Sequence, residues 1–173
     1  MADVQGALAQ LLEASLDPRQ NKPGMLKPSK VRRGTTYSAA NINQAELALR
    51  QEETKPGFSL QLLQIAASPS YPYSTRLASA LLFKNFIRRN WTDEDGNYKL
   101  QLEEVVTIKG ELISLMISVP AGIQAQLGEA VSAIADSDFW ERWDTLVDVS
   151  GRQILTRGEL LHHSFLLTIM NFV

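Results

Sequence analysis

Short amphipathic segments that end at proline or glycine recur along this chain, and they restrict what it can fold into. In 4–16, apolar residues return at spacings of three and four, and Asp17 and Pro18 follow. That spacing places apolar side chains on one face of a helix. Segments with related patterns are 43–53, 57–67, 74–90, 100–118 and 120–136. No segment shows a clear alternation of apolar and polar residues of the kind that predicts a β-strand, so the predicted class is all-α.

Grouped in pairs, these segments predict a repeat. The pairs are 4–16 with 43–53, 57–67 with 74–90, and 100–118 with 120–136. Apart from a loop in the first pair, they recur near the ~40 to 47 residues of HEAT and armadillo units. Because such units bury their apolar faces only against neighbours, we expect a HEAT-repeat superhelix of about three to four helical hairpins.

The longest clear helix, 74–90, predicts a core face and a polar face. The expected core residues are Leu77, Ala78, Leu81, Leu82, Phe86 and Ile87, and the residues expected opposite them are Lys84, Asn85, Arg88 and Arg89. Basic residues on a repeat helix either receive an acidic partner or are simply solvated.

Composition narrows the classes of partner. The formal net charge is −2, whereas a protein that neutralises nucleic-acid phosphates needs a basic excess, so we predict no nucleic-acid partner. The first twenty residues lack a secretory pattern, and the apolar segment 160–173 is shorter than the ~20 residues that cross a bilayer. We therefore predict a soluble chain without a membrane partner, and the absence of cysteine suits a reducing compartment.

The segment 23–41 holds prolines, glycines and the basic run KPSKVRR without an apolar period, which predicts a flexible loop. The basic run is either a nuclear-localisation element or incidental.

The TDEDGN sequence at 92–97 predicts an acidic turn, because its glycine comes too early for a calcium-binding loop of the EF-hand type. Asp138 is expected to cap a following helix, with Glu141 completing a capping-box pattern.

Candidate catalytic and metal-binding groups are few. Adjacent His162 and His163 would point about 100° apart on a helix, which does not favour a shared metal. The tryptophans Trp91, Trp140 and Trp143 are expected to anchor repeat packing rather than form a ligand cage. With no cysteine and no glycine-rich phosphate loop, we predict no enzyme, no catalytic residues, no metal and no cofactor.

Several ordered blocks resemble one family. They are AELALRQEETKPGFSLQLLQIAA, RLASALLFKNFIRRNW, DEDGNYKL and IQAQLGEAVSAIADSDFWERW. Together they look like the amino-terminal part of importin-beta-type nuclear transport receptors, over roughly 2–22 and 44–148. The segment 23–41 interrupts a turn that is short in the family, and the likeness ends after Asp148. We therefore expect amino-terminal repeats over 1–149 and a divergent tail over 150–173, as in a truncated product, an alternatively spliced product or a gene-model artefact.

The resemblance implies that the second helices of the repeats line a concave face where Ran in its GTP form docks. Carried onto this chain, the polar candidates for Ran binding are Arg50, Lys84, Asn85, Arg88, Gln126 and Glu129. The resemblance further implies importin alpha as the cargo of the full-length receptor and movement between nucleus and cytoplasm. Two alternatives stay open: a helical scaffold for another protein, or a truncated product without an independent function.

Overall fold

The computed structural model describes residues 2–15, 47–138 and 142–143. Within these ranges the regular elements are helices, and the one β-type feature is an isolated bridge between Thr92 and Tyr98. The helices are α1 (Ala2–Ser15), a short helix at 47–52, α3 (Phe58–Ala67), α4 (Tyr73–Asn90), α5 (Leu102–Ser118) and α6 (Ala121–Asp138). The predicted all-α class is therefore confirmed.

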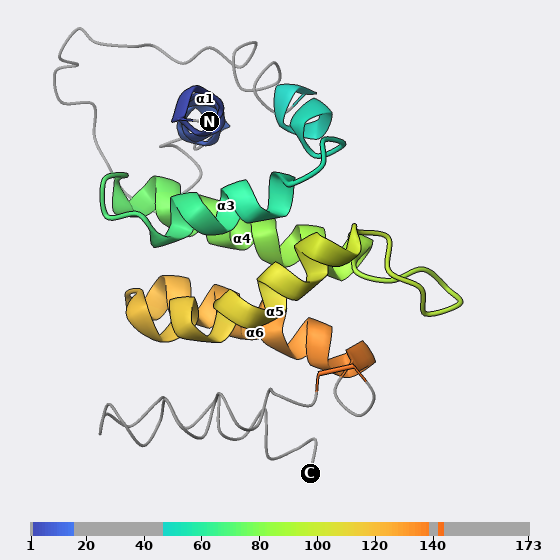
Figure 1. The fold of residues 1–173 in the computed structure, drawn as a ribbon. Helices are drawn as coiled ribbons and strands as arrows, with labels where there is room; N and C mark the ends of the chain where they lie inside the picture. The colour runs from blue at the N-terminus through green and yellow to red at the C-terminus, as the bar shows by residue number, and fades with distance from the viewer. Residues whose placement is uncertain (1, 16–46, 139–141, 144–173) are drawn as a thin grey trace, which may run out of the picture.

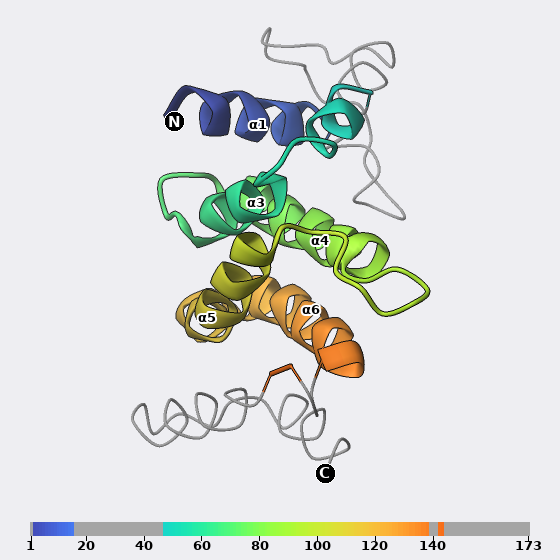
Figure 2. The same cartoon turned by 45° about the vertical axis from the view of Figure 1, so that its right-hand side comes forward.

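The helices form a stack of hairpins that follows the chain order. In Figures 1 and 2, α1 and the 47–52 helix lie at one end, the α3–α4 hairpin comes next, and the α5–α6 hairpin lies beyond it. First helix contacts first helix, α3 with α5, and second helix contacts second helix, α4 with α6. This arrangement is that of HEAT repeats, in which each hairpin buries its apolar face against its neighbours.

One continuous core joins the hairpins. Phe58 of α3 packs edge-on against Phe86 of α4, with ring centroids 5.5 Å apart. Phe83 and Ile87 of α4 are fully buried, as is Leu127 of α6. Helix α4 therefore buries residues in the middle of the stack, where it contacts α1, α3 and α6.

Helix boundaries differ slightly from the predicted ones. The α5 helix starts at Leu102 rather than at residue 100, and α6 ends at Asp138 rather than at 136. Pro120 precedes α6, and its carbonyl accepts hydrogen bonds from the backbone N–H groups of Ile123 and Gln124, both at 2.9 Å. Pro120 thus lies just before α6, and its carbonyl accepts the first hydrogen bonds of that helix.

A carboxylate from the third hairpin helps to start the second. Gly57 precedes α3 with a φ of 76°, in the left-handed region that glycine adopts without a Cβ penalty. Its backbone N–H donates to Glu104 Oε2 at 3.3 Å, and Ser59 Oγ donates to Glu104 Oε1. A residue of α5 thereby satisfies the Gly57 N–H, just before α3, and the Ser59 hydroxyl in the first turn of α3.

We expect Gly57→Ala to lower the free energy of unfolding by about 1 kcal/mol, because a Cβ disfavours the left-handed conformation by ~1–2 kcal/mol. Space does not oppose the change, since no atom lies within 4 Å of the added Cβ. The matched control is Gly110→Ala in α5, where the Cβ also meets open space and alanine is favoured in a helix by up to about 1 kcal/mol. Urea unfolding should move the two midpoints in opposite directions, and a shared direction would contradict the argument.

Candidate functional site: the paired surface of α4 and α6

Three of the predicted binding residues meet where α4 and α6 lie side by side. Lys84 Nζ donates to Gln126 Oε1 at 2.8 Å and lies 3.0 Å from Glu129 Oε2. The Lys84 side chain is 11% exposed, whereas that of Glu129 is 49% exposed. We call Lys84, Gln126 and Glu129 the polar seam. It joins the second helices of two consecutive hairpins.

The other predicted binding residues are exposed and lie outside the seam. Asn85 and Arg88 follow Lys84 on α4, and Arg50 lies on the 47–52 helix. Among the described residues, no hydrogen bond or ion pair engages the side chain of any of these residues. Because Arg88 comes four residues after Lys84, it lies on the same face of α4, one turn further along.

The division of α4 into two faces was partly wrong. Leu81, predicted in the core, is 44% exposed, while Lys84, predicted on the solvated face, is buried at 9% exposure. Phe83, which was not predicted in the core, is fully buried. The reason is that α4 packs against both α3 and α6, so its buried surface is not a single stripe. The lysine reaches the edge of this buried surface with its ammonium bound to α6.

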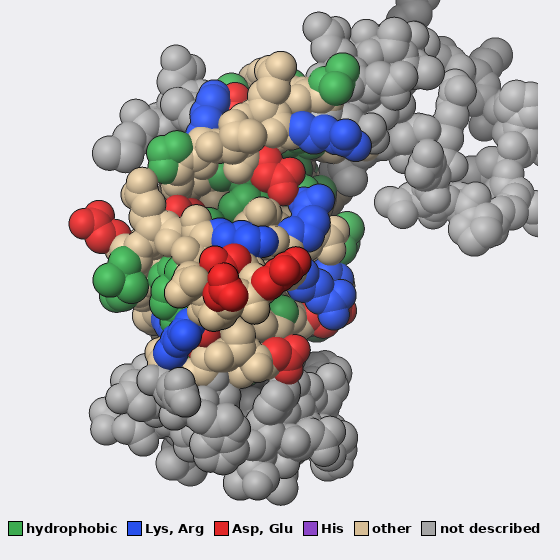
Figure 3. Space-filling view, turned by 90° about the vertical axis from the view of Figure 1, so that its right-hand side faces the viewer, with side chains coloured by type: hydrophobic (Ala, Val, Ile, Leu, Met, Phe, Trp, Pro, Cys, Tyr) green, Lys and Arg blue, Asp and Glu red, His purple; other side chains and the backbone are tan. Residues whose placement is uncertain are grey.

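The face that carries the carboxyl-terminal end of α4 and the 92–100 connection has charges of both signs. Figure 3 shows Lys and Arg side chains lying beside Asp and Glu side chains there. Arg89 Nη2 lies 2.7 Å from Glu53 Oε1, and Lys55 Nζ lies 2.6 Å from Glu52 Oε1. The Arg89 side chain is therefore paired within the chain, whereas that of Arg88 has no ion-pair partner among the described residues.

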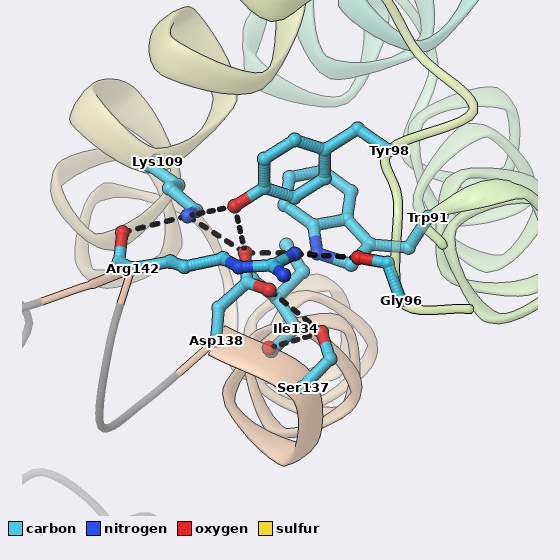
Figure 4. Close-up of polar contacts among 8 residues, drawn as sticks. All are labelled: Trp91, Gly96, Tyr98, Lys109, Ile134, Ser137, Asp138 and Arg142. Carbon is cyan, nitrogen blue, oxygen red and sulfur yellow. Dashed lines mark hydrogen bonds and ion pairs between the residues drawn. The ribbon is translucent and has the colours of Figure 1, made fainter. Parts of the chain in front are cut away.

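A second polar network centres on Asp138, whose predicted role was different. Asp138 is the last residue of α6 and is fully buried. Its Oδ2 accepts hydrogen bonds from Trp91 Nε1 at 3.0 Å and Tyr98 Oη at 2.9 Å, and lies 2.7 Å from Lys109 Nζ (Figure 4). Its Oδ1 accepts from Ser137 Oγ at 2.9 Å. The carboxylate thus ties the end of α6 to preceding helices, while Glu141 of the expected capping box lies outside the described residues.

Aromatic rings surround the cation of this network. Lys109 Nζ lies 5.2 to 5.9 Å from the ring centroids of Trp91, Tyr98 and Trp143. Trp91 and Trp143 are each 3% exposed, which confirms their predicted packing role, and Trp140 lies outside the described residues. The cage that these rings form already holds a lysine of the same chain, which is stabilised by the ring faces.

Burial and hydrogen bonding act on Asp138 in opposite directions. Desolvation raises the pKa of its carboxyl, but hydrogen bonds from Lys109, Tyr98 and Ser137 and the charge of Lys109 together leave the pKa below its ordinary value. The network therefore favours the ionised carboxylate, as expected when donors and a cation face it.

The predicted acidic turn at 92–97 is confirmed. Asp93 Oδ1 accepts the backbone N–H of Asp95 at 3.0 Å and that of Asn97 at 2.7 Å, and Gly96 adopts a φ of 80°. The Asn97 backbone N–H is the main cause that lowers the pKa of Asp93. Arg142 Nη1 donates to the Gly96 carbonyl at 2.6 Å, which fastens the turn beside the Asp138 network.

Several predictions lie outside the described residues: the flexible loop 23–41 with its basic run, the tail 150–173, His162 and His163. In the ranges that the structure describes, no group of three or more histidine, cysteine, aspartate or glutamate residues is placed to hold a metal. No helix in those ranges is long and apolar enough to span a bilayer.

Comparison with known proteins connects this stack to nuclear transport. Residues 45–118 match the importin-beta N-terminal domain. The importin alpha re-exporter of Saccharomyces cerevisiae is 47% identical over 136 residues, which are 78% of this chain and 14% of that protein. Exportin-2 of Drosophila melanogaster is 36% identical over 60% of this chain and 11% of its own length.

A solved structure shares the fold. The exportin Cse1 in its cargo-free, cytoplasmic state, a HEAT-repeat solenoid, aligns with a TM-score of 0.68 and 43% identity over 84% of this chain and 13% of that chain. This chain thus spans about one seventh of the length of the Saccharomyces cerevisiae protein and of the Cse1 chain. The paired helices, the matched domain and these identities together show that the chain carries an importin-beta N-terminal domain and is homologous to the amino-terminal part of the importin-alpha re-exporters.

Proposed function

We propose that this chain is a segment of a nuclear export receptor that binds Ran in its GTP form through the surface of its second helices. The observation that carries the proposal is the polar seam, which places side chains of α4 and α6 on one continuous surface. Arg88 and Asn85 extend this surface along α4, and Arg50 adds a cation from the 47–52 helix. Homology to importin-alpha re-exporters supports Ran as the partner.

The chemistry of this surface is suited to recognition of a protein. A partner that spans two hairpins can contact α4 and α6 together, because these helices lie side by side. Exposed guanidinium groups donate paired hydrogen bonds to carboxylates, and the half-exposed Glu129 offers a charge of opposite sign. Complementary charges of this kind set the register and the rate of association more than they set the affinity.

Cargo binding belongs to a larger assembly. Because this chain spans 14% of the Saccharomyces cerevisiae relative, we propose that it binds importin alpha hardly at all on its own. The same proposal places the chain in both nucleus and cytoplasm. No catalytic step, metal or cofactor takes part in it.

We expect weak binding to Ran loaded with a non-hydrolysable GTP analogue, with a Kd on the order of 10 μM or higher, and weaker binding still to Ran loaded with GDP. Isothermal titration calorimetry measures both. Arg88→Ala should weaken the GTP-state complex about 10-fold by removing an exposed guanidinium from the surface.

The control is Lys55→Ala, which removes an exposed cation that already pairs with Glu52 and should change the Kd by less than about 2-fold. Equal heats for the two nucleotide states, or no heat with either, would exclude the proposed function.

A further inference from the structure

We infer that Lys84 positions Glu129 and Gln126 rather than contacting the partner, so that the partner presents a basic group to the polar seam. This inference rests on the proposed function, and it assigns the sign of charge that the seam recognises. The sequence and the resemblance predict that Lys84 either receives an acidic group of the partner or is simply solvated.

Burial separates Lys84 from the other candidates. Its side chain is 11% exposed, and its ammonium is directed at two oxygen atoms of α6, at 2.8 Å and 3.0 Å. A cation held in this way is already neutralised, and its removal would leave a partly buried polar contact unmade. Lys84 therefore has little charge left to offer an incoming carboxylate.

The group that remains accessible at the seam is the acidic one. Glu129 is 49% exposed, and only its Oε2 is engaged with Lys84. Among the described residues, Oε1 of Glu129 has no hydrogen-bond donor. A partner carboxylate that approaches here would meet Glu129 before Lys84 and be repelled, whereas a lysine or arginine would be attracted.

One turn away the sign reverses. Arg88 lies on the same face of α4 as Lys84, is exposed, and is unpaired within the described residues. The surface thus offers an acceptor at Glu129 and a donor at Arg88. The matching protein surface therefore carries a basic group that faces Glu129 and an acidic group that faces Arg88.

A charge swap in the full chain tests this inference. Lys84→Glu alone brings two carboxylates together and should lower the thermal midpoint, and adding Glu129→Lys should restore most of that loss by remaking the bridge. Because the exposed end of the bridge is then cationic, the double variant should bind Ran carrying a GTP analogue at least about 10-fold more weakly than the unmodified chain. A restored midpoint with unchanged affinity would overturn the inference.

A second cycle separates positioning from contact. Lys84→Met should weaken binding about 5-fold to 10-fold in the unmodified chain, and by less than about 2-fold when Glu129→Gln is already present. If Lys84→Met weakened binding by the same factor with and without Glu129→Gln, Lys84 would contact the partner itself, and the inference would be wrong. If the unmodified chain binds neither form of Ran, the proposed function fails, whereas binding that ignores the charge swap defeats this inference alone.

Discussion

Replacing Asp138 with asparagine is expected to lower the free energy of unfolding by about 3 kcal/mol, because it removes one partner of a buried ion pair and leaves the other charge uncompensated. Asp138 is fully buried, and the Lys109 side chain that faces it at 2.7 Å is 12% exposed. Two further donors, Trp91 Nε1 and Tyr98 Oη, would also face a weaker acceptor. Chemical unfolding monitored by tryptophan fluorescence measures the loss.

The matched control is Asp136→Asn, which changes the same residue type at an exposed position of α6 and should stay within about 0.5 kcal/mol. Acid should reproduce the effect of the Asp138 substitution. Since the pKa of Asp138 is lowered in the folded state, its contribution is complete above the ordinary value of 3.8 and disappears as the pH falls through the lowered value. A difference between the two variants that persisted unchanged well below that range would contradict this account.

Replacing Phe83 with alanine is expected to cost about 3–5 kcal/mol, the usual range for loss of a buried phenylalanine ring. The ring is fully buried in α4, the helix that contacts α1, α3 and α6, so little of the resulting cavity can collapse without moving several helices. The thermal midpoint and the urea midpoint should both fall.

The control lies two residues earlier on the same helix. Leu81→Ala removes a side chain that is 44% exposed and should cost about 1 kcal/mol or less. Simple periodicity places Leu81 in the core and does not predict Phe83 there, so equal costs for the two variants would favour the periodicity over the observed packing.

The helices could be predicted from the sequence because proline, glycine and apolar spacing act locally. Each predicted segment that the structure describes is a helix, with ends displaced by a few residues at most. Which residues of α4 are buried was harder to predict, since a helix between two hairpins is buried on more than one side. A lysine with a long apolar stem can also lie at the edge of the buried surface. Its partners on α6 are more than 40 residues away in the sequence.

Asp138 shows the same limit more clearly. Its position before a possible helix is typical of a helix cap. No nearby residue in the sequence indicates that Trp91, Tyr98 and Lys109 contact its carboxylate. A usable signal in the sequence is the combination of aromatic residues of the kind that are usually buried with a lysine in the middle of α5. The candidate binding residues, by contrast, are predicted from the resemblance, and the structure adds which of their side chains are paired among the described residues and which are not.

The Asp138 network has a mechanical consequence. Trp91 ends the second hairpin and Asp138 ends the third, so swinging one hairpin against the other would pull an indole from a sequestered carboxylate. We therefore expect the second and third hairpins to move together as one rigid unit. We expect a change in superhelical pitch to occur first elsewhere, for example between α1 and α3, where the polar contact between Gln5 and Gln64 is exposed.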